Sequence, residues 1–193
     1  MNVYESFVAA FPVDTVGPAM PYGNKGMVGI PGFEELIDMG AGKSFGGGLV
    51  RIHSSAEAFR ATAFIADAFP EYAGRVLPVA KDWLGRQYAV MHPVEQVLLL
   101  IEPGSGDAFE VDCGLEDLFD REMVTDPNTY LARDLFLDWK ALNPGILSSG
   151  QCVGFKVPLF LGGDDSLENL EISDEEVYWS IMGQLRSAAE GHS

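Results

Sequence analysis

The chain has 193 residues, of which 47% are hydrophobic and 11% aromatic, so it can build an ordinary core, and this composition excludes a fully disordered chain. Its 29 acidic residues outnumber 12 basic ones, and the formal net charge of −17 disfavours nucleic acid and anionic membrane surfaces as partners. The negative field would speed an encounter with a basic protein, although solubility alone accounts for such a charge equally well.

The N-terminus and the cysteines indicate a reducing, cytoplasmic setting. The first eleven residues lack a basic start, and Glu5 interrupts their apolar run, so they do not form a secretory signal. The longest apolar stretch elsewhere, Val97 to Ile101, is far too short to span a membrane. Cys113 and Cys152 make no disulfide framework. We therefore expect a cytoplasmic protein.

In chain order, the pattern predicts helices on both sides of a strand-rich middle third. Helices are expected over residues 3–11, 31–39, 56–69, 115–124, 126–142 and 174–189, and strands over residues 49–53, 75–82, 87–92, 96–102, 108–111 and 152–161. Asp126 or Asn128 is the expected cap of the fifth helix, and Ser173 with Glu176 is the expected capping box of the last. Phe59 is expected to face the core.

The middle strands predict the fold class. Four consecutive strands between residues 75 and 111 are joined by short turns, including the glycine-rich segment Pro103–Asp107, and such a series is typical of an antiparallel meander. We therefore expect an α+β fold in which an antiparallel-dominated sheet is flanked by helices. Residues 143–150 are the best candidate for a boundary, and the strand after them is expected to return to the same sheet.

Several motifs that carry chemistry in other proteins are incomplete in this chain. The segment Gly40–Ser44, GAGKS, lacks the first glycine of a phosphate-binding loop, because Ile37 occupies that position, and a helix precedes it instead of a strand. It is better read as a helix end followed by a surface turn. His53, His92 and His192 are too far apart to form a helical metal site. There is no C-x-x-C pair and no G-x-S-x-G elbow.

Acidic residues gather in two runs. One run comprises Asp164, Asp165, Glu168, Glu171, Asp174, Glu175 and Glu176, and the other Asp107, Glu110, Asp112, Glu116, Asp117 and Asp120. Neither run has the spacing of a calcium loop. Residues 174–176 also suit a helix N-terminus, where negative charge is favourable. A solvated surface and a partner-facing patch both remain open, and an enzyme using paired carboxylates is a further alternative.

Three segments resemble known families. Residues 30–52 read IPGFEELIDMGAGKSFGGGLVRI, and the middle strands contain VAKDWLGRQYAV and VLLLIEPGSGDAFEVDCGLEDLF. These parts resemble GAD-like domains and the related SUKH superfamily. Residues 152–185 read CVGFKVPLFLGGDDSLENLEISDEEVYWSIMGQL. This run is similar to a C-terminal domain of type VI secretion immunity proteins, in which it follows a GAD-like domain.

The resemblance covers residues 30–185 and carries expectations for the whole chain. It implies a GAD-like domain over residues 1–142 and an immunity-associated domain over residues 143–193, packed on the same sheet as one SUKH-like unit. It also implies an immunity protein, not an enzyme, that neutralises a cognate secreted toxin, often a DNase, by stoichiometric binding in the cytoplasm. No catalytic residue, cofactor or metal is expected.

The expected partner is a toxin with a basic surface, which the negative charge of the chain would attract. Asp164, Asp165, Glu168 and Glu171 are the predicted partner contacts, since they lie in a predicted loop without Lys or Arg, and recognition residues tend to lie in loops. A housekeeping or regulatory scaffold of the same fold, with no toxin partner, is the alternative.

Overall fold

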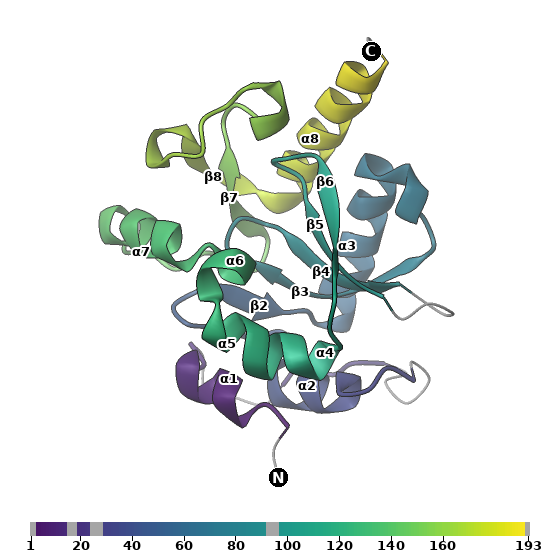
Figure 1. The fold of residues 1–193 in the computed structure, drawn as a ribbon, viewed down its shortest axis with the longest axis vertical. Helices are drawn as coiled ribbons and strands as arrows, with labels where there is room; N and C mark the ends of the chain where they lie inside the picture. Colours follow the sequence, from purple (N-terminus) through teal and green to yellow (C-terminus); the bar gives the residue numbers. More distant parts are fainter. Residues whose placement is uncertain (1–2, 15–18, 24–28, 92–96, 192–193) are drawn as a thin grey trace.

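A six-stranded antiparallel sheet forms the centre of the computed structural model, which describes residues 3–14, 19–23, 29–91 and 97–191 (Figure 1). Its strands are β1 (Ser44–Phe45), β2 (Val50–Ile52), β3 (Val76–Asp82), β4 (Gln87–Met91), β5 (Leu98–Glu102) and β6 (Asp107–Val111). Each strand pairs with the next one in the chain, so the spatial order equals the chain order. This meander, flanked by helices, confirms the predicted α+β class. His92 and His192 lie outside the described residues.

Helices cover both faces of the sheet. They are α1 (Glu5–Ala10), α2 (Phe33–Gly40), α3 (Ser55–Ala68), α4 (Leu115–Asp117), α5 (Met123–Thr125), α6 (Pro127–Leu131), α7 (Arg133–Leu142) and α8 (Glu175–Glu190), with a π-helical segment, Leu118–Glu122, between α4 and α5. None of the described helices has both the length and the apolar character that a membrane span requires.

The pleat of the strands divides the core into two layers. Tyr88 pairs with Leu100, and both pack with side chains of α1, α2 and α4. Their chain neighbours Ala89 and Leu99 point to the opposite face and pack with α3 and α8. Since both faces are covered, the middle strands read as continuous apolar runs instead of alternating ones. The hairpin between β5 and β6 closes at Gly106, whose φ of 73° suits glycine.

The strand predicted over residues 152–161 is shorter and lies elsewhere. β7 (Gln151–Phe155) pairs with β8 (Leu170–Asp174) in a separate two-stranded sheet, so the prediction that it returns to the main sheet is wrong. β7 meets the main sheet at the turn after β3, where Val153 N donates to Trp83 O (2.8 Å) and Cys152 lies against Gly85. A strand that arrives at a turn finds no strand edge there with which to form a ladder, and β8 supplies one instead.

The helix predicted over residues 126–142 is interrupted. Ala132 has φ 48° and separates α6 from α7. Side chains of the turn between β3 and β4 satisfy carbonyl groups at this break: Trp83 Nε1 donates to Leu131 O (3.0 Å), and Arg86 Nη2 donates to Tyr130 O (2.9 Å). Tertiary hydrogen bonds therefore stabilise the left-handed backbone conformation of Ala132, which the local sequence does not predict.

Two predictions about single residues in helices are also wrong. Asp174, not Ser173, is the N-cap of α8, and its carboxylate accepts from Val177 N (3.1 Å). Phe59 does not face the core: it is 78% exposed, because Ala58 and Ile65 occupy the buried side of α3.

Candidate partner-binding surface

The four predicted contact residues lie on one exposed segment. Asp164 and Asp165 are in the connection between β7 and β8, and Glu168 is in a 3₁₀ turn (Leu167–Asn169) of the same connection, whereas the prediction that Glu171 lies in the loop is wrong, because Glu171 is in β8; all four are exposed. Among the described residues, no ion pair engages any of these four carboxylates. Their role as partner contacts stays a prediction.

The backbone of this segment is fixed by hydrogen bonds from the side chains of Asn169 and Lys156. Asn169 Nδ2 donates to Asp164 O (2.8 Å) and to Val157 O (2.9 Å), and Asn169 Oδ1 accepts from Val157 N (2.9 Å). Lys156 Nζ donates to Glu168 O (2.7 Å). Position 163 requires glycine, because a Cβ atom there would lie only 2.0 Å from Val157 O. This segment, residues 164–171, is called the acidic loop below. Its hydrogen-bonded backbone holds the exposed carboxylates in place.

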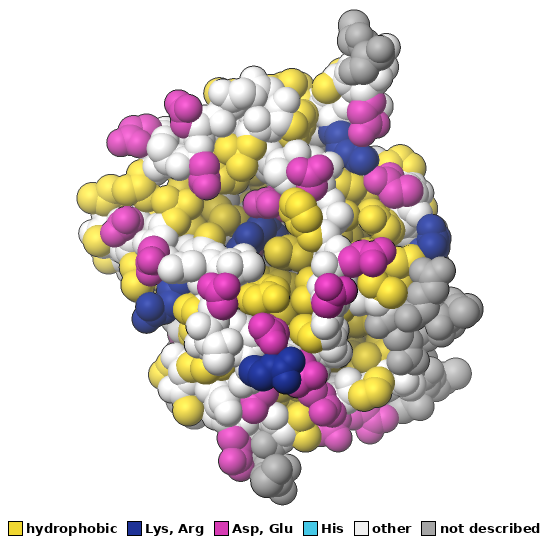
Figure 2. Space-filling view, viewed as in Figure 1, with side chains coloured by type: hydrophobic (Ala, Val, Ile, Leu, Met, Phe, Trp, Pro, Cys, Tyr) yellow, Lys and Arg dark blue, Asp and Glu magenta, His cyan; other side chains and the backbone are white. Residues whose placement is uncertain are grey.

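Exposed apolar side chains accompany these carboxylates. Large hydrophobic residues that are at least 47% exposed are concentrated between residues 137 and 181: Leu137, Leu142, Ile146, Val157, Leu161, Ile172, Val177 and Ile181. Figure 2 shows apolar and acidic side chains interspersed over α7 and the β7–β8 region. Lys140 and Lys156 are the basic residues of this span, and both donate to backbone carbonyls. Such a mixture of apolar and unpaired acidic groups suits a partner that is both apolar and basic.

A groove lies beside the edge of the main sheet, and Figure 2 shows the molecule hollowed at this place. Its volume is about 460 Å³. Leu100, Phe109 and Tyr130 supply apolar surface, and Glu102 and Arg86 supply charge. Sequence analysis did not identify this groove, because its walls come from β5, β6 and α6 and meet only in the folded chain.

A buried polar network connects α8 to the sheet. Glu175 accepts from Lys81 Nζ (2.6 Å) with one oxygen and from Gln87 Nε2 (2.9 Å) with the other. Lys81 Nζ also donates to Ser149 O (2.9 Å) and Gln151 O (3.1 Å). Burial raises the pKa of Glu175, against the opposing effect of Lys81. Every N–H donor of the Lys81 ammonium group therefore has an acceptor within the protein.

His53 extends the network. Its Nε2 lies 2.8 Å from Gln87 Oε1. Because the amide nitrogen of Gln87 donates to Glu175, Oε1 must accept, which places the imidazole proton on Nε2. Nδ1 is buried and has no hydrogen-bond partner among the described residues. Burial lowers the pKa of His53 to about 4, although the hydrogen bond to Gln87 opposes the shift. The side chains of this network are buried, so the network contributes to the stability of the fold.

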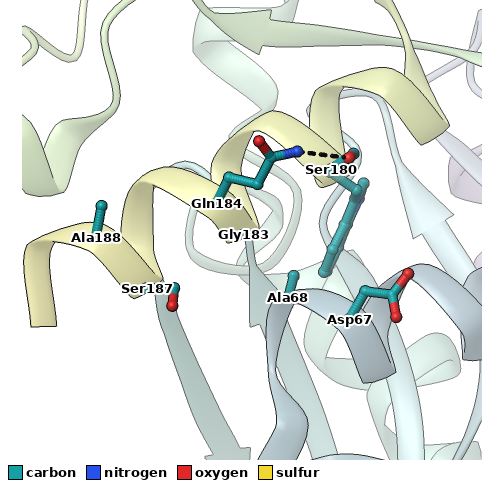
Figure 3. Close-up of a pocket in the computed structure, with 8 residues that line it drawn as sticks. Asp67, Ala68, Ser180, Gly183, Gln184, Ser187 and Ala188 are labelled. Carbon is teal, nitrogen blue, oxygen red and sulfur yellow. Dashed lines mark hydrogen bonds between the residues drawn. The ribbon is translucent and has the colours of Figure 1, made fainter. Parts of the chain in front are cut away.

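A second hollow lies between α3 and α8, and few reactive side chains line it (Figure 3). Its volume is about 540 Å³, and it forms where Gly183 allows α8 to lie against Ala68 of α3. Gln184 Nε2 donates to Ser180 Oγ (3.2 Å) within it. The described residues that line it include no histidine, cysteine or basic residue, and Asp67 supplies their carboxylate.

The residues considered for metal or nucleotide chemistry are not assembled into a site. Among the described residues, no group of three His, Cys, Asp or Glu side chains is placed to hold a metal ion. Burial raises the pKa of the Cys152 thiol, which opposes formation of a reactive thiolate. The segment Gly40–Ser44 runs from the end of α2 into β1, which confirms the predicted helix end, but the turn does not lie at the open surface: Ala41 is buried, and Gly42, Lys43 and Ser44 are partly buried.

Comparisons with known proteins bear on the part of the chain that carries this surface. Residues 115–186 match the family model described as "T6SS immunity protein Tdi1, C-terminal". A crystal structure described as Atu4351 from Agrobacterium tumefaciens is similar to this chain with a TM-score of 0.62 and 17% identity, over 94% of this chain and 88% of that one, which shows a shared fold. No curated protein matches the chain. The segment with the acidic loop and the exposed apolar residues is thus similar to the C-terminal part of type VI secretion immunity proteins.

Proposed function

We propose that the protein is a cytoplasmic immunity protein that binds a cognate secreted toxin and neutralises it as a stoichiometric complex. The observation that carries this proposal is the match of residues 115–186 to a type VI immunity family, because the acidic loop and the exposed apolar residues lie within that segment. The division into a GAD-like domain over residues 1–142 and an immunity-associated domain over residues 143–193, within a SUKH-like fold, is part of the same proposal.

The chemistry of the surface supports a toxin with a basic face, such as a DNase. A nuclease grips phosphate groups with Lys and Arg, and a rigid acidic loop offers these residues carboxylates in place of phosphates. Exposed aliphatic side chains such as Leu142 and Ile146, each 71% exposed, would be buried against the toxin and slow its dissociation. The net charge of −17 would raise the association rate. Inhibition then follows from occupation or distortion of the toxin's substrate groove.

The proposal is tested by co-expressing the protein with the toxin encoded beside it and scoring survival of the host, followed by titration of the purified pair. We expect survival and a complex with one-to-one stoichiometry. A host that is killed equally with and without this protein would reject the immunity function and favour a scaffold without a toxin partner.

The acidic loop is tested with charge reversals. Changing Asp164, Asp165, Glu168 and Glu171 together to Lys should weaken toxin binding by about tenfold or more and make it less sensitive to salt. Asp164→Lys/Asp165→Lys compared with Glu34→Lys/Glu35→Lys gives a matched control, since both double changes reverse two adjacent exposed carboxylates. Unchanged affinity in the quadruple variant rejects this loop as the contact.

A further inference from the structure

The outer edge of β6 is open. β6 is the last strand of the main sheet and pairs with β5 alone. Among the described residues, the hydrogen bonds that reach the backbone of residues 107–111 from outside the β5–β6 pair are local ones at its two ends: Cys113 N donates to Val111 O (2.8 Å), and Asp107 N donates to Ser105 Oγ (3.3 Å). At the other end of the sheet, β1 has only two residues, and Phe45 already forms a bridge with Val13. An edge strand whose central residues, 108–110, pair on one side only is a template for another strand.

The groove lies on the sheet face beside this edge. Phe109 pairs with Leu100, so both side chains share one face, and both line the groove. Phe109 is 48% exposed although its partner is buried. Tyr130 of α6 forms part of the opposite wall. The groove therefore offers apolar surface to a side chain from a segment that lies along β6.

The charge around the edge is negative. Glu102, Glu110 and Asp112 line the groove. Arg86 is the basic residue there, but its Nε donates to the buried Asp82 carboxylate (2.5 Å) and its Nη2 donates to Tyr130 O. That pair is internally neutral, which leaves three carboxylates without an ion pair among the described residues. A cationic side chain in the groove could place its aliphatic stem on Phe109 and Leu100 and its charged end near Glu102 and Asp112, whereas the side chain of Glu110, opposite Leu99, points to the other face of the sheet.

Charges on an edge strand also have a protective role, because they discourage edge-to-edge aggregation. Here they exclude a second copy of this chain in particular. Pairing of β6 with another β6 would bring Asp107, Glu110 and Asp112 of both copies together, and opposed like charges are destabilising. The same carboxylates favour a strand that carries Lys or Arg.

We propose that β6 binds an extended, basic segment of the toxin as an additional strand, with one of its side chains in the groove lined by Phe109 and Glu102. This proposal rests on the proposed immunity function and adds a second contact, separate from the acidic loop. Main-chain pairing would supply affinity, and the groove would supply selectivity for a basic residue with an apolar stem.

The test is hydrogen–deuterium exchange of the full chain, alone and in the complex purified from co-expression with the adjacent toxin. We expect the amides of residues 107–111 that face outward to exchange fast in the free protein and at least about tenfold more slowly in the complex. Protection of this segment without toxin that grows with protein concentration would indicate self-pairing and overturn the proposal.

A variant pair tests the role of charge. Glu102→Gln/Asp112→Asn should weaken toxin binding by about tenfold, whereas Glu34→Gln/Glu35→Gln removes the same charge from α2 and should change it by less than about twofold. Thermal unfolding of both variants verifies that they fold. An equal loss in both variants would mean that only overall charge matters, and it would overturn the proposal.

The outcomes separate this proposal from the proposed function. If the wild-type chain protects the host and binds the toxin, but exchange over residues 107–111 is unchanged, the immunity function stands and the strand-addition proposal is wrong. If the wild-type chain forms no complex with the toxin, the immunity function itself is rejected before any variant is measured.

Discussion

The carboxylates between residues 164 and 176 look alike in the sequence, but the fold separates them by burial. Glu175 is 8% exposed and bonded to Lys81 and Gln87. Asp164 and Asp165 are exposed and have no ion pair among the described residues. A buried charge without its partner is costly, whereas an exposed one is solvated. The same residue type therefore acts on stability at Glu175 and is available for binding at Asp164 and Asp165.

Lys81→Met should destabilise the protein by about 3–5 kcal/mol, because it leaves Glu175 charged and buried and removes the donor to Ser149 O and Gln151 O. Urea unfolding measures this loss, and Lys81→Met/Glu175→Gln should recover part of it. Asp117→Asn breaks an exposed pair with Arg121 and should cost less than about 1 kcal/mol. Equal losses for the two variants would show that burial does not make the Lys81–Glu175 pair more important for stability than the exposed pair.

His53 should make stability fall on acidification. Its folded pKa of about 4 lies below the value of 6.5 in the unfolded chain, so between these values the unfolded chain binds the extra proton. Stability is full above pH 6.5 and decreases as pH falls to 4, by about 3 kcal/mol in total from this residue. His53→Gln removes the titration, and its free energy of unfolding should depend less on pH in this window. Parallel pH profiles for the two proteins would show that His53 is not responsible.

At the scale of elements, the start of α8 gives a sharp comparison. Asp174→Ala should cost about 1 kcal/mol, because the carboxylate of Asp174 accepts from Val177 N. Ser173→Ala should cost much less, since Ser173 is not the cap of this helix. Denaturant unfolding of the two variants decides between them. A larger loss for Ser173→Ala would restore the capping box that the sequence predicted.

The strands of the main sheet could be predicted because local signals specify them. Alternation, apolar runs and glycine-rich turns such as Pro103–Gly106 mark β3 to β6 within the chain itself. The partner of β7 could not be predicted, since it depends on where Trp83 and Gly85 stand in the folded protein. The break at Ala132 has the same origin, because Trp83 and Arg86 satisfy the carbonyls that it frees.

The candidate surface was predictable in part for a similar reason. The absence of Lys and Arg among the acidic residues 164–176 is visible in the sequence and led to Asp164 and its neighbours. The exposure of Leu142 and Ile146 is not visible, because apolar residues in helical patterns usually face the core. The groove beside β6 combines residues from three elements, and only the register of β5 and β6 shows that Phe109 and Leu100 share a face.

At the scale of the whole molecule, the excess of 29 acidic over 12 basic residues acts at a distance. Under the proposed function, such a field would attract a basic toxin before contact, and dissolved ions would screen it over about 10 Å at 0.1 M salt.

The association rate with the toxin should therefore fall by about tenfold between 0.05 M and 0.5 M salt, while the dissociation rate changes much less. Stopped-flow mixing and surface plasmon resonance measure the two rates. A salt effect confined to dissociation would place the electrostatics in short-range contacts instead.

The attachment of residues 143–193 to the rest of the chain limits how such proteins can diversify. Trp179 Nε1 donates to Gly85 O (3.0 Å), and Glu175 binds Lys81, so this stretch interlocks with positions encoded far upstream. A C-terminal segment taken from a related protein would not fit the surface formed by residues 81–87 unless those residues were exchanged together with it. Under the proposed immunity function, new toxin specificities should arise by substitutions in the exposed loop and the β6 edge more readily than by exchange of residues 143–193 as a whole.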